Sequence, residues 1–423
     1  MKRLDEILAS ELPKLRVENN QYLSYASVAG LTALDKALSN RKDERRDLVA
    51  MIDDGPVVDF VLDRISRRLS DREVYNPEAA ERPLTELSSF ADPSAISREI
   101  VAEFDTLPWD YTFTFPLPQA ISERVGPLLD QLGSITLSDD VKLVLGTGLA
   151  EGAYPLPEPA APGTGLGAFF SGLLVQPEWN AEGVYLQVRC RGYVDRYGLT
   201  GTARDATAIL HAFIGIGIAQ HVFRYDWRVP TFLASPRFTY HVHVNQGDGW
   251  RHNGTVEPEG TLATAFSNMA CVEFHDLKTF GKMMGWAFTK VRTCFTHPKK
   301  ADRIVRAAQW LFDSHASRNQ TLAFLQSMVA LEILLGERAV TELVGIGTLL
   351  SNRCAYLIGK SQAQREELLS DFGALYKVRS DIVHSGKNRL SNSETNMLNK
   401  LRWICARAIQ EEIDLLEQDV RKV

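Results

Sequence analysis

The spacing of hydrophobic residues changes twice along the chain. In residues 1–72, apolar side chains recur every three or four positions, the period of an α-helix. Between about residues 106 and 297, apolar and polar residues alternate in several stretches, which predicts β-strands. These stretches are WDYTFTFPLP (109–118), GVYLQVRCRGYV (183–194), RFTYHVHVN (237–245) and MACVEFHDL (269–277). From Lys299 onward the helical period returns and the alternation stops.

The two changes predict three regions and an α+β fold class. Residues 1–105 form a helical N-terminal segment, in which 26–40 and 57–70 have the clearest helical pattern. Residues 106–297 form an α+β region, with a helix at 202–223 that is apolar on most faces and therefore buried. A Gly-, Pro- and Ala-rich stretch at 146–172 is expected to be a loop. Residues 299–423 form an all-α bundle.

Five helices are expected in this bundle, joined by short loops. Gly336, Gly359 and Gly386 follow three of them, where C-terminal caps usually lie. Before the last helix, either Ser391 or Ser393 is suited to cap the N-terminus, with Glu394 in the first turn. The expected helices are 301–317, 320–336, 341–359, 364–386 and 394–420.

Composition is that of an ordinary globular protein, with 45% hydrophobic and 24% charged residues. No run of 18 apolar residues predicts a membrane-spanning helix, and acids interrupt the N-terminal stretch where a signal peptide needs an apolar region. We therefore expect a cytoplasmic protein without a membrane partner. The five cysteines are scattered, without a CxxC pair, and predict buried thiols.

The net charge of −6 is unevenly distributed. From Lys299 to the end there are 18 basic and 15 acidic residues, so this part alone is slightly basic. Such a balance permits a nucleic-acid contact in the C-terminal bundle without requiring one.

Three stretches of the C-terminal part resemble one known family. They are FLQSMVALEILLG (324–336), LSNRCAYLIG (350–359) and LYKVRSDIVHSG (375–386). Over residues 301–420 the chain resembles the HEPN superfamily, and within it the Apea-like HEPN domains of bacterial anti-phage proteins. The last stretch is similar to the family's pattern of Tyr, Arg with a polar neighbour, His and Gly. In this chain Ser385 separates the histidine from the glycine, which is a departure from that pattern.

The resemblance implies a metal-independent endoribonuclease that acts as a homodimer on RNA and needs no cofactor. It implies a toxin-like effector of bacterial anti-phage or abortive-infection defence. The N-terminal region would then sense a phage or stress ligand, or select the RNA, by analogy with the family. The alternative is a non-catalytic HEPN module for dimerisation or nucleotide binding, which carries a ligand-binding N-terminal domain.

Two residues of the last stretch suit RNA cleavage on chemical grounds. The 2′-hydroxyl of RNA is the nucleophile, so the enzyme must transfer protons and stabilise a charged phosphorane. His384 can act as general acid or base near neutral pH. Arg379 can bind phosphate oxygens through its planar, permanently charged guanidinium. On an ideal helix these two residues point about 140° apart. They would converge only if the helix ends or distorts near His384, or across the two-fold axis of a dimer.

Further residues are expected to support this pair. Ser380 lies one turn before His384 on the same face, and Asp381 could orient the imidazole or cap the turn. Tyr376 belongs to the family pattern. Glu332 interrupts an apolar run and needs a cationic partner, for which Arg353 and Arg379 are both candidates. A basic rim for RNA phosphates is expected from Lys377, Lys387, Arg389 and Arg402, with Arg407 beside them.

A competing hypothesis places a metal site in the α+β region. Alternation along a strand puts His241 and His243 on one side, and does the same for Glu273 and His275. Two such strands side by side could supply histidine and carboxylate ligands. No third spaced cluster supports this arrangement, so the prediction of a metal-free site is retained.

Overall fold

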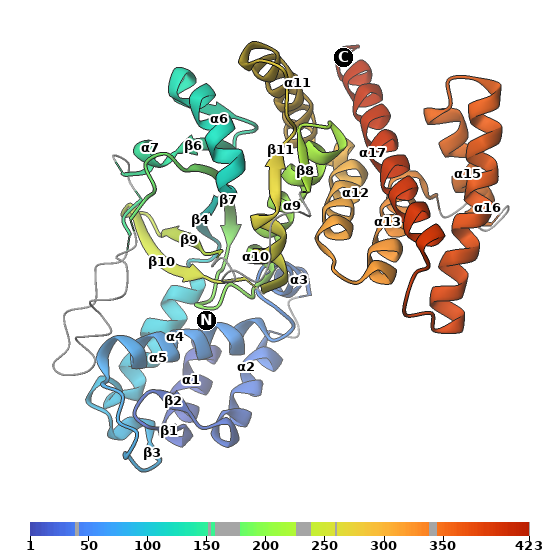
Figure 1. Ribbon diagram of the computed structural model, residues 1–423. Helices are drawn as coiled ribbons and strands as arrows, with labels where there is room; N and C mark the ends of the chain where they lie inside the picture. The colour runs from blue at the N-terminus through green and yellow to red at the C-terminus, as the bar shows by residue number, and fades with distance from the viewer. Residues whose placement is uncertain are drawn as a thin grey trace. The chain divides into compact units, whose positions relative to one another are not determined.

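The computed structural model describes residues 1–38, 42–150, 154–156, 178–225, 238–258, 260–337 and 345–422. Contacts between Cα atoms divide the chain, which is drawn in Figure 1, into two compact units. Unit 1 comprises residues 1–112, 189–206 and 242–256. Unit 2 comprises residues 113–188, 207–241 and 257–423. Each unit is therefore assembled from segments that are far apart in the sequence.

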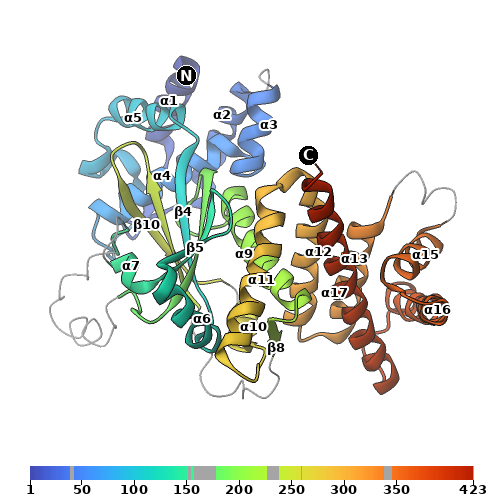
Figure 2. The ribbon, with the colours of Figure 1, turned by 90° about the horizontal axis from the view of Figure 1, so that it is seen from above.

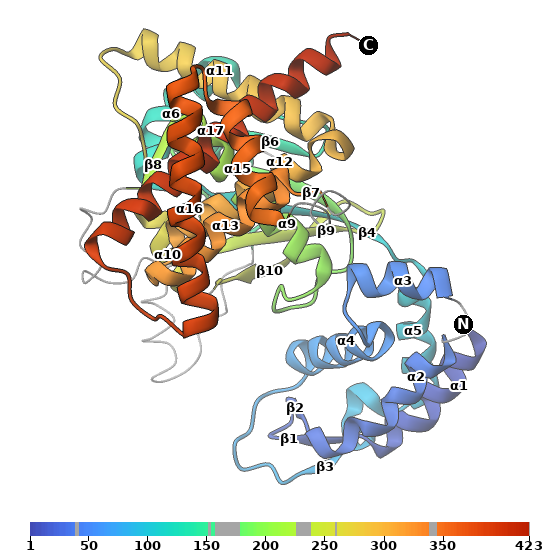
Figure 3. The same ribbon diagram turned by 90° about the vertical axis from the view of Figure 1, so that its right-hand side faces the viewer.

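Unit 1 is built around the N-terminal helices α1 (Lys2–Glu11), α2 (Thr32–Ala37), α3 (Lys42–Met51), α4 (Pro56–Arg72) and α5 (Pro93–Asp105). Helix α1 packs on α2 and α5, and α4 packs on the same two helices (Figure 3). A small sheet beside them has the strand order β2 (Tyr22–Leu23), β1 (Arg16–Glu18) and β3 (Arg82–Pro83).

Aromatic side chains fill the core of unit 1. The Phe60 ring contacts Phe104, Trp109 and Tyr193 at centroid distances of 4.9–6.0 Å. Beneath them the buried carboxylate of Asp63 accepts hydrogen bonds from the Arg67 Nε at 2.7 Å and from the Tyr193 hydroxyl. A buried charge needs such partners, because an unpaired carboxylate in the core would be strongly destabilising.

A six-stranded sheet has the order β10-β9-β4-β7-β6-β5. Strands β5, β6 and β7 pair antiparallel, and Leu143 on β6 faces both Ile135 and Leu186 in register. All three of these side chains are buried, as expected for strands that face a hydrophobic core. The strands are β4 (Trp109–Pro116), β5 (Ser134–Thr136), β6 (Val141–Leu145), β7 (Val184–Gly192), β9 (Tyr240–Asn245) and β10 (Trp250–Val256).

The remaining elements of unit 2 before the bundle are mostly helical. They are α6 (Gln119–Leu132), α7 (Gly146–Ala150), α9 (Gly201–Ala219, which begins in unit 1), β8 (Phe223–Tyr225), α10 (Gly260–Ser267), β11 (Met269–Cys271) and α11 (Leu277–Thr296). Strands β8 and β11 form a separate antiparallel pair. The helix predicted at 202–223 is confirmed as α9.

Five helices of the described chain make the C-terminal bundle, as the sequence predicts. They are α12 (Pro298–Ala316), α13 (Gln320–Leu335), α15 (Ile346–Ile358), α16 (Gln362–Ser385) and α17 (Asn392–Val420). Helices α12, α13 and α17 pack against one another, and α15 pairs with α16 (Figures 1 and 3). The α+β fold class with a helical C-terminal part is thus confirmed. In the described residues no helix is both long and apolar enough to cross a bilayer.

Ion pairs connect α11 and α17, which lie close together in Figure 2. The Lys290 Nζ lies 2.6 Å from an Asp414 oxygen and 2.8 Å from a Glu417 oxygen. Only 8% of the Lys290 side chain is exposed, so this cation depends on its two carboxylate partners.

Three local predictions differ from the structure. The strand expected at 269–277 stops at Cys271, because its partner β8 pairs with only three residues, and Asp276 then caps α11 from residue 277 by accepting the Thr279 N–H. The helix expected at 26–40 starts as a 3-10 helix, Tyr25–Leu31, before α2. The loop expected at 146–172 begins as the short helix α7, and residues 151–153 and 157–172 lie outside the described part.

Candidate functional site

Helix α16 positions both predicted catalytic residues. Its N-terminus is capped by Ser361, whose side chain accepts the Gln364 N–H, and its C-terminus by Gly386 in the left-handed conformation (φ 66°). Between these caps the helix is continuous through Ser385, so it neither ends nor unwinds before His384. Arg379 and His384 consequently point about 140° apart within one chain. Of the two routes to convergence, only assembly with a second copy is compatible with this helix.

Arg379 is paired with Glu332. The Arg379 Nη2 lies 3.9 Å from the Glu332 Oε1, which joins α16 to α13. Both side chains are about one-third exposed, so the pair lies at the edge of the core. Burial raises the pKa of the Glu332 carboxyl, and the Arg379 charge counteracts part of that rise. Arg353, the other candidate partner, instead donates to the Leu335 carbonyl at 2.7 Å.

Tyr376 lies one turn before Arg379 and its hydroxyl is buried. Among the described residues, this hydroxyl has no hydrogen-bond partner. Burial, followed by the nearby Glu332 charge, raises the pKa of the phenol, so the side chain stays neutral at any physiological pH. The ring faces Gly347 on α15, where an added Cβ would come within 3.5 Å of it. Tyr376 therefore packs α16 against α15 rather than projecting into solvent.

The exposed surface of α16 carries the polar part of the motif. Ser380 and His384 are both exposed, one turn apart on the same face. Asp381 is half-buried, and its backbone carbonyl accepts the N–H groups of Gly386 and Lys387. It is the main chain of Asp381 that caps the turn.

The expected basic rim is only partly assembled. Lys377 and Arg389 are exposed near the motif. The Lys387 ammonium donates to Glu394, and Arg407 is paired with Glu411 at 2.7 Å. Arg402 does not join them, because it is buried among α12, α13 and α17.

Arg402 forms hydrogen bonds inside the bundle. Its Nε donates to the Ser314 hydroxyl at 3.0 Å, and its Nη2 donates to the Ser314 carbonyl. The Ser314 hydroxyl also contacts that of Ser327 at 2.7 Å. Burial lowers the pKa of the Arg402 guanidinium to about 10. The expected contact of Arg402 with RNA phosphates was wrong for this arrangement of the chain, because the residue is only 8% exposed.

The alternative metal site is not assembled. His241 and His243 lie on β9 in the six-stranded sheet, whereas Glu273 and His275 follow β11, which pairs with β8 in a separate sheet. The two pairs of residues are therefore not on neighbouring strands, as that hypothesis required. Within the described part of the chain, no group of three or more His, Cys, Asp or Glu side chains is arranged to hold a metal ion.

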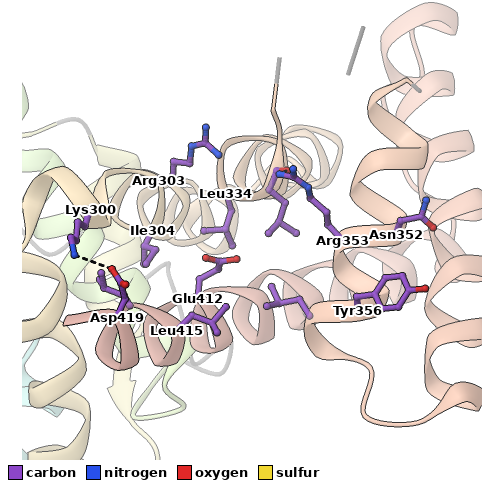
Figure 4. Close-up of a pocket in the computed structure, with 13 residues that line it drawn as sticks. Lys300, Arg303, Ile304, Leu334, Asn352, Arg353, Tyr356, Glu412, Leu415 and Asp419 are labelled. Atoms are coloured by element: carbon purple, nitrogen blue, oxygen red, sulfur yellow. Dashed lines mark hydrogen bonds and ion pairs between the residues drawn. The ribbon is translucent and has the colours of Figure 1, made fainter. Parts of the chain in front are cut away.

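A cavity of about 820 Å³ lies in the bundle among α12, α13, α15 and α17 (Figure 4). Lys300 and Asp419 mark one end of it, and Asn352 and Tyr356 mark the other. Glu412 lies between these ends, beside Leu334. The sequence carries no local sign of this cavity, because its lining residues come from four helices and share no local pattern.

Comparison with protein-family models, with curated proteins and with solved structures finds no match to the chain. A permanently charged guanidinium 3.9 Å from a carboxylate can bind phosphate, and an exposed imidazole can transfer protons.

Proposed function

We propose that this chain is a metal-independent endoribonuclease of the HEPN type, active as a homodimer. The observation that carries the proposal is the pairing of Arg379 with Glu332 five residues before an exposed His384 on the same helix. An isolated carboxylate in the apolar run 328–335 would be destabilising, so its presence opposite Arg379 is well explained by a need to orient that guanidinium. The similarity of the three helical stretches to HEPN sequences supplies the reaction class.

In this proposal Arg379 binds the oxygens of the scissile phosphate. The 2′-oxygen of the RNA attacks phosphorus, the bond to the 5′-oxygen breaks, and the products carry a 2′,3′-cyclic phosphate and a 5′-hydroxyl. One proton leaves the 2′-hydroxyl and another reaches the departing 5′-oxygen. His384 performs one of these transfers, and His384 of the second copy can perform the other. Ser380 shares the face of His384 and is placed to hydrogen-bond the same substrate.

Two exposed apolar residues on α16 support a homodimer. Leu369 and Val383 are 41% and 47% exposed. They lie fourteen positions apart, close to four helical turns, so they project from nearly the same side of the helix. A second copy packed on this side would cover both residues and place two His384 side chains near one interface. About 21 Å of helix separates the two residues, so they are separate apolar contacts, and a dimer that covers both would remove their surface from water.

The proposed biological role is a toxin-like effector of bacterial anti-phage or abortive-infection defence in the cytoplasm. In that role the N-terminal region senses a phage or stress ligand, or selects the RNA. This part of the proposal follows from the family resemblance, and fold-level analogy alone supports it.

A second candidate is a non-catalytic module for dimerisation or ligand binding. The continuous helix between Arg379 and His384 favours it, because a single chain does not bring the two side chains together. The cavity of the bundle favours it as well.

RNA cleavage in EDTA separates the two candidates. Total bacterial RNA is incubated with the wild type, Arg379→Ala and His384→Ala, and product ends are mapped. His275→Ala and Arg306→Ala are matched controls, since both residues are exposed and lie outside the motif. Cleavage by the wild type and the controls alone, leaving 2′,3′-cyclic phosphates, supports the endoribonuclease. Equal cleavage by all five proteins, or cleavage that requires a divalent metal, refutes this assignment of the site.

A further inference from the structure

The cavity between α12, α13, α15 and α17 has the size and lining of a small-molecule site. Its volume of about 820 Å³ lies within the usual range for ligand pockets. All of its lining residues belong to unit 2 and to described helices. None of them is part of the Arg379–His384 motif.

Much of the lining is aliphatic. Ile304 on α12, Leu334 on α13, Leu357 on α15 and Leu416 on α17 contribute to the walls. Leu415 also lines the cavity and keeps 49% of its surface exposed. An apolar ligand that covers these side chains would remove hydrophobic surface from water, which favours binding.

Cationic side chains come from two helices. Arg303 on α12 and Arg353 on α15 both interact electrostatically with the Glu412 carboxyl on α17. Burial raises the pKa of the Glu412 carboxyl, and the Arg353 and Arg303 charges offset part of that rise. Arg353 is held in place by the Leu335 carbonyl at 2.7 Å and by Glu337.

The charges in and beside the lining leave Arg303 as the cation available to an anionic group of a ligand. Lys300, Arg303 and Arg353 are the cations, and Glu412 and Asp419 are the anions, which leaves one net positive charge. Lys300 and Asp419 form an ion pair of 2.9 Å at one end. Arg353 is paired with Glu337, which lies outside the lining, so Arg303 remains opposite the partly buried Glu412 carboxyl. A dianion such as a phosphate monoester would be repelled by Glu412 more strongly than a carboxylate, and a protonated Glu412 could donate a hydrogen bond to a carboxylate.

We propose that this cavity binds a small amphipathic carboxylic acid, with its carboxylate at Arg303 and its aliphatic body against the leucines. Recognition combines one charge-assisted contact with burial of an alkyl chain. The site is independent of the proposed nuclease activity, because no residue of the motif lines it.

Titration calorimetry with decanoate, below its micelle concentration, tests the proposal on the full-length protein. We expect saturable binding of one decanoate per chain. Decanol and decyltrimethylammonium should bind at least tenfold more weakly, since they lack the anionic group. Decyl phosphate should also bind more weakly than decanoate. Tighter binding of decyl phosphate would overturn the choice of a carboxylate.

Three variants locate the binding site. Arg303→Gln should weaken decanoate binding by about tenfold or more, as the loss of a charged hydrogen bond predicts. Arg306→Gln is the matched control, because Arg306 is exposed on the same helix, pairs with Asp302 and does not line the cavity. Glu412→Gln should tighten binding severalfold, because it removes the opposing carboxylate. Absence of binding to the wild type, or equal affinity of all three variants, would overturn the proposal.

Discussion

Replacing Lys290 by methionine should destabilise the packing of α11 on α17. The methionine retains the aliphatic stem of Lys290 but removes the ammonium that lies 2.6 Å from Asp414 and 2.8 Å from Glu417. The two carboxylates respond differently. Asp414 is 48% exposed and can be solvated, whereas Glu417 is 13% exposed and loses its main cationic partner.

The size of the expected stability loss follows from the difference in exposure between the two carboxylates. Breaking a fully buried ion pair costs about 3–5 kcal/mol, and breaking an exposed pair costs about 0.2–1 kcal/mol. Since only one of the two carboxylates is largely buried, we expect Lys290→Met to lower the free energy of unfolding by about 2–3 kcal/mol. Burial alone would lower the pKa of Lys290. The hydrogen bonds to Asp414 and Glu417 raise this pKa by more than burial lowers it, so the net shift is upward. The stabilisation is therefore fully present at neutral pH and is lost only at alkaline pH, as the ammonium deprotonates.

Urea unfolding followed by circular dichroism at 222 nm measures the effect at pH 7 and low salt. Lys282→Met on the same helix is the control, because Lys282 is exposed. The double variant Lys290→Met/Glu417→Leu also removes the negative charge of Glu417. It should recover more than half of the unfolding free energy that Lys290→Met loses. If Lys290→Met is as stable as the wild type, or if the double variant is less stable than the single one, the reasoning about the buried carboxylate is refuted.

Three further variants test other parts of the bundle by the same unfolding measurement. Hydrogen bonds from Lys387 and from the Ser391 N–H lower the pKa of Glu394 to about 2, so its stabilisation is present above about pH 4.5 and is lost as the pH falls toward 2. Glu394→Gln should thus be less stable than the wild type by about 1 kcal/mol at pH 7. If this difference in unfolding free energy is not smaller at pH 3, the prediction is contradicted. Phe324→Ala, at a fully buried position of α13, should cost about 3–5 kcal/mol, and a loss below about 1 kcal/mol would mean that the site is not packed as described. Tyr376→Phe should change stability by less than about 0.5 kcal/mol because its hydroxyl has no described partner, and a larger loss would reveal one.

Local signals in the sequence predicted the helical bundle well. The amphipathic period and the cap residues placed all five helices, and Ser391 proves to be the cap of α17, in a capping box with Glu394. Gly386 adopts the left-handed conformation that a glycine after a helix commonly supplies. A charged residue in an apolar run also led correctly to a pairing of Glu332 with an arginine, because an unpaired carboxylate there would be unfavourable.

Features that depend on contacts between residues far apart in the chain could not be predicted from the sequence. Alternation at 269–277 suggested a strand, but β11 has only the three residues that pair with β8, and α11 begins at Leu277. Arg402 looked like its neighbours in the basic rim, yet it lies on the buried side of α17. The cavity and the cluster around Lys290 combine residues more than 100 positions apart. Nothing in a local window distinguishes such residues from solvated charges.

The hydrogen bonds of Arg402 restrict how α17 can slide along its neighbours. A displacement by one turn would move the guanidinium about 5.4 Å away from Ser314 and leave it in an apolar environment. Leucines and alanines elsewhere in the interface would tolerate that shift far better, because they exchange one apolar contact for another. A buried polar group of this kind selects one axial alignment among several of similar hydrophobic energy. The bundle therefore gains a defined alignment of three helices from a residue that contributes little net stability.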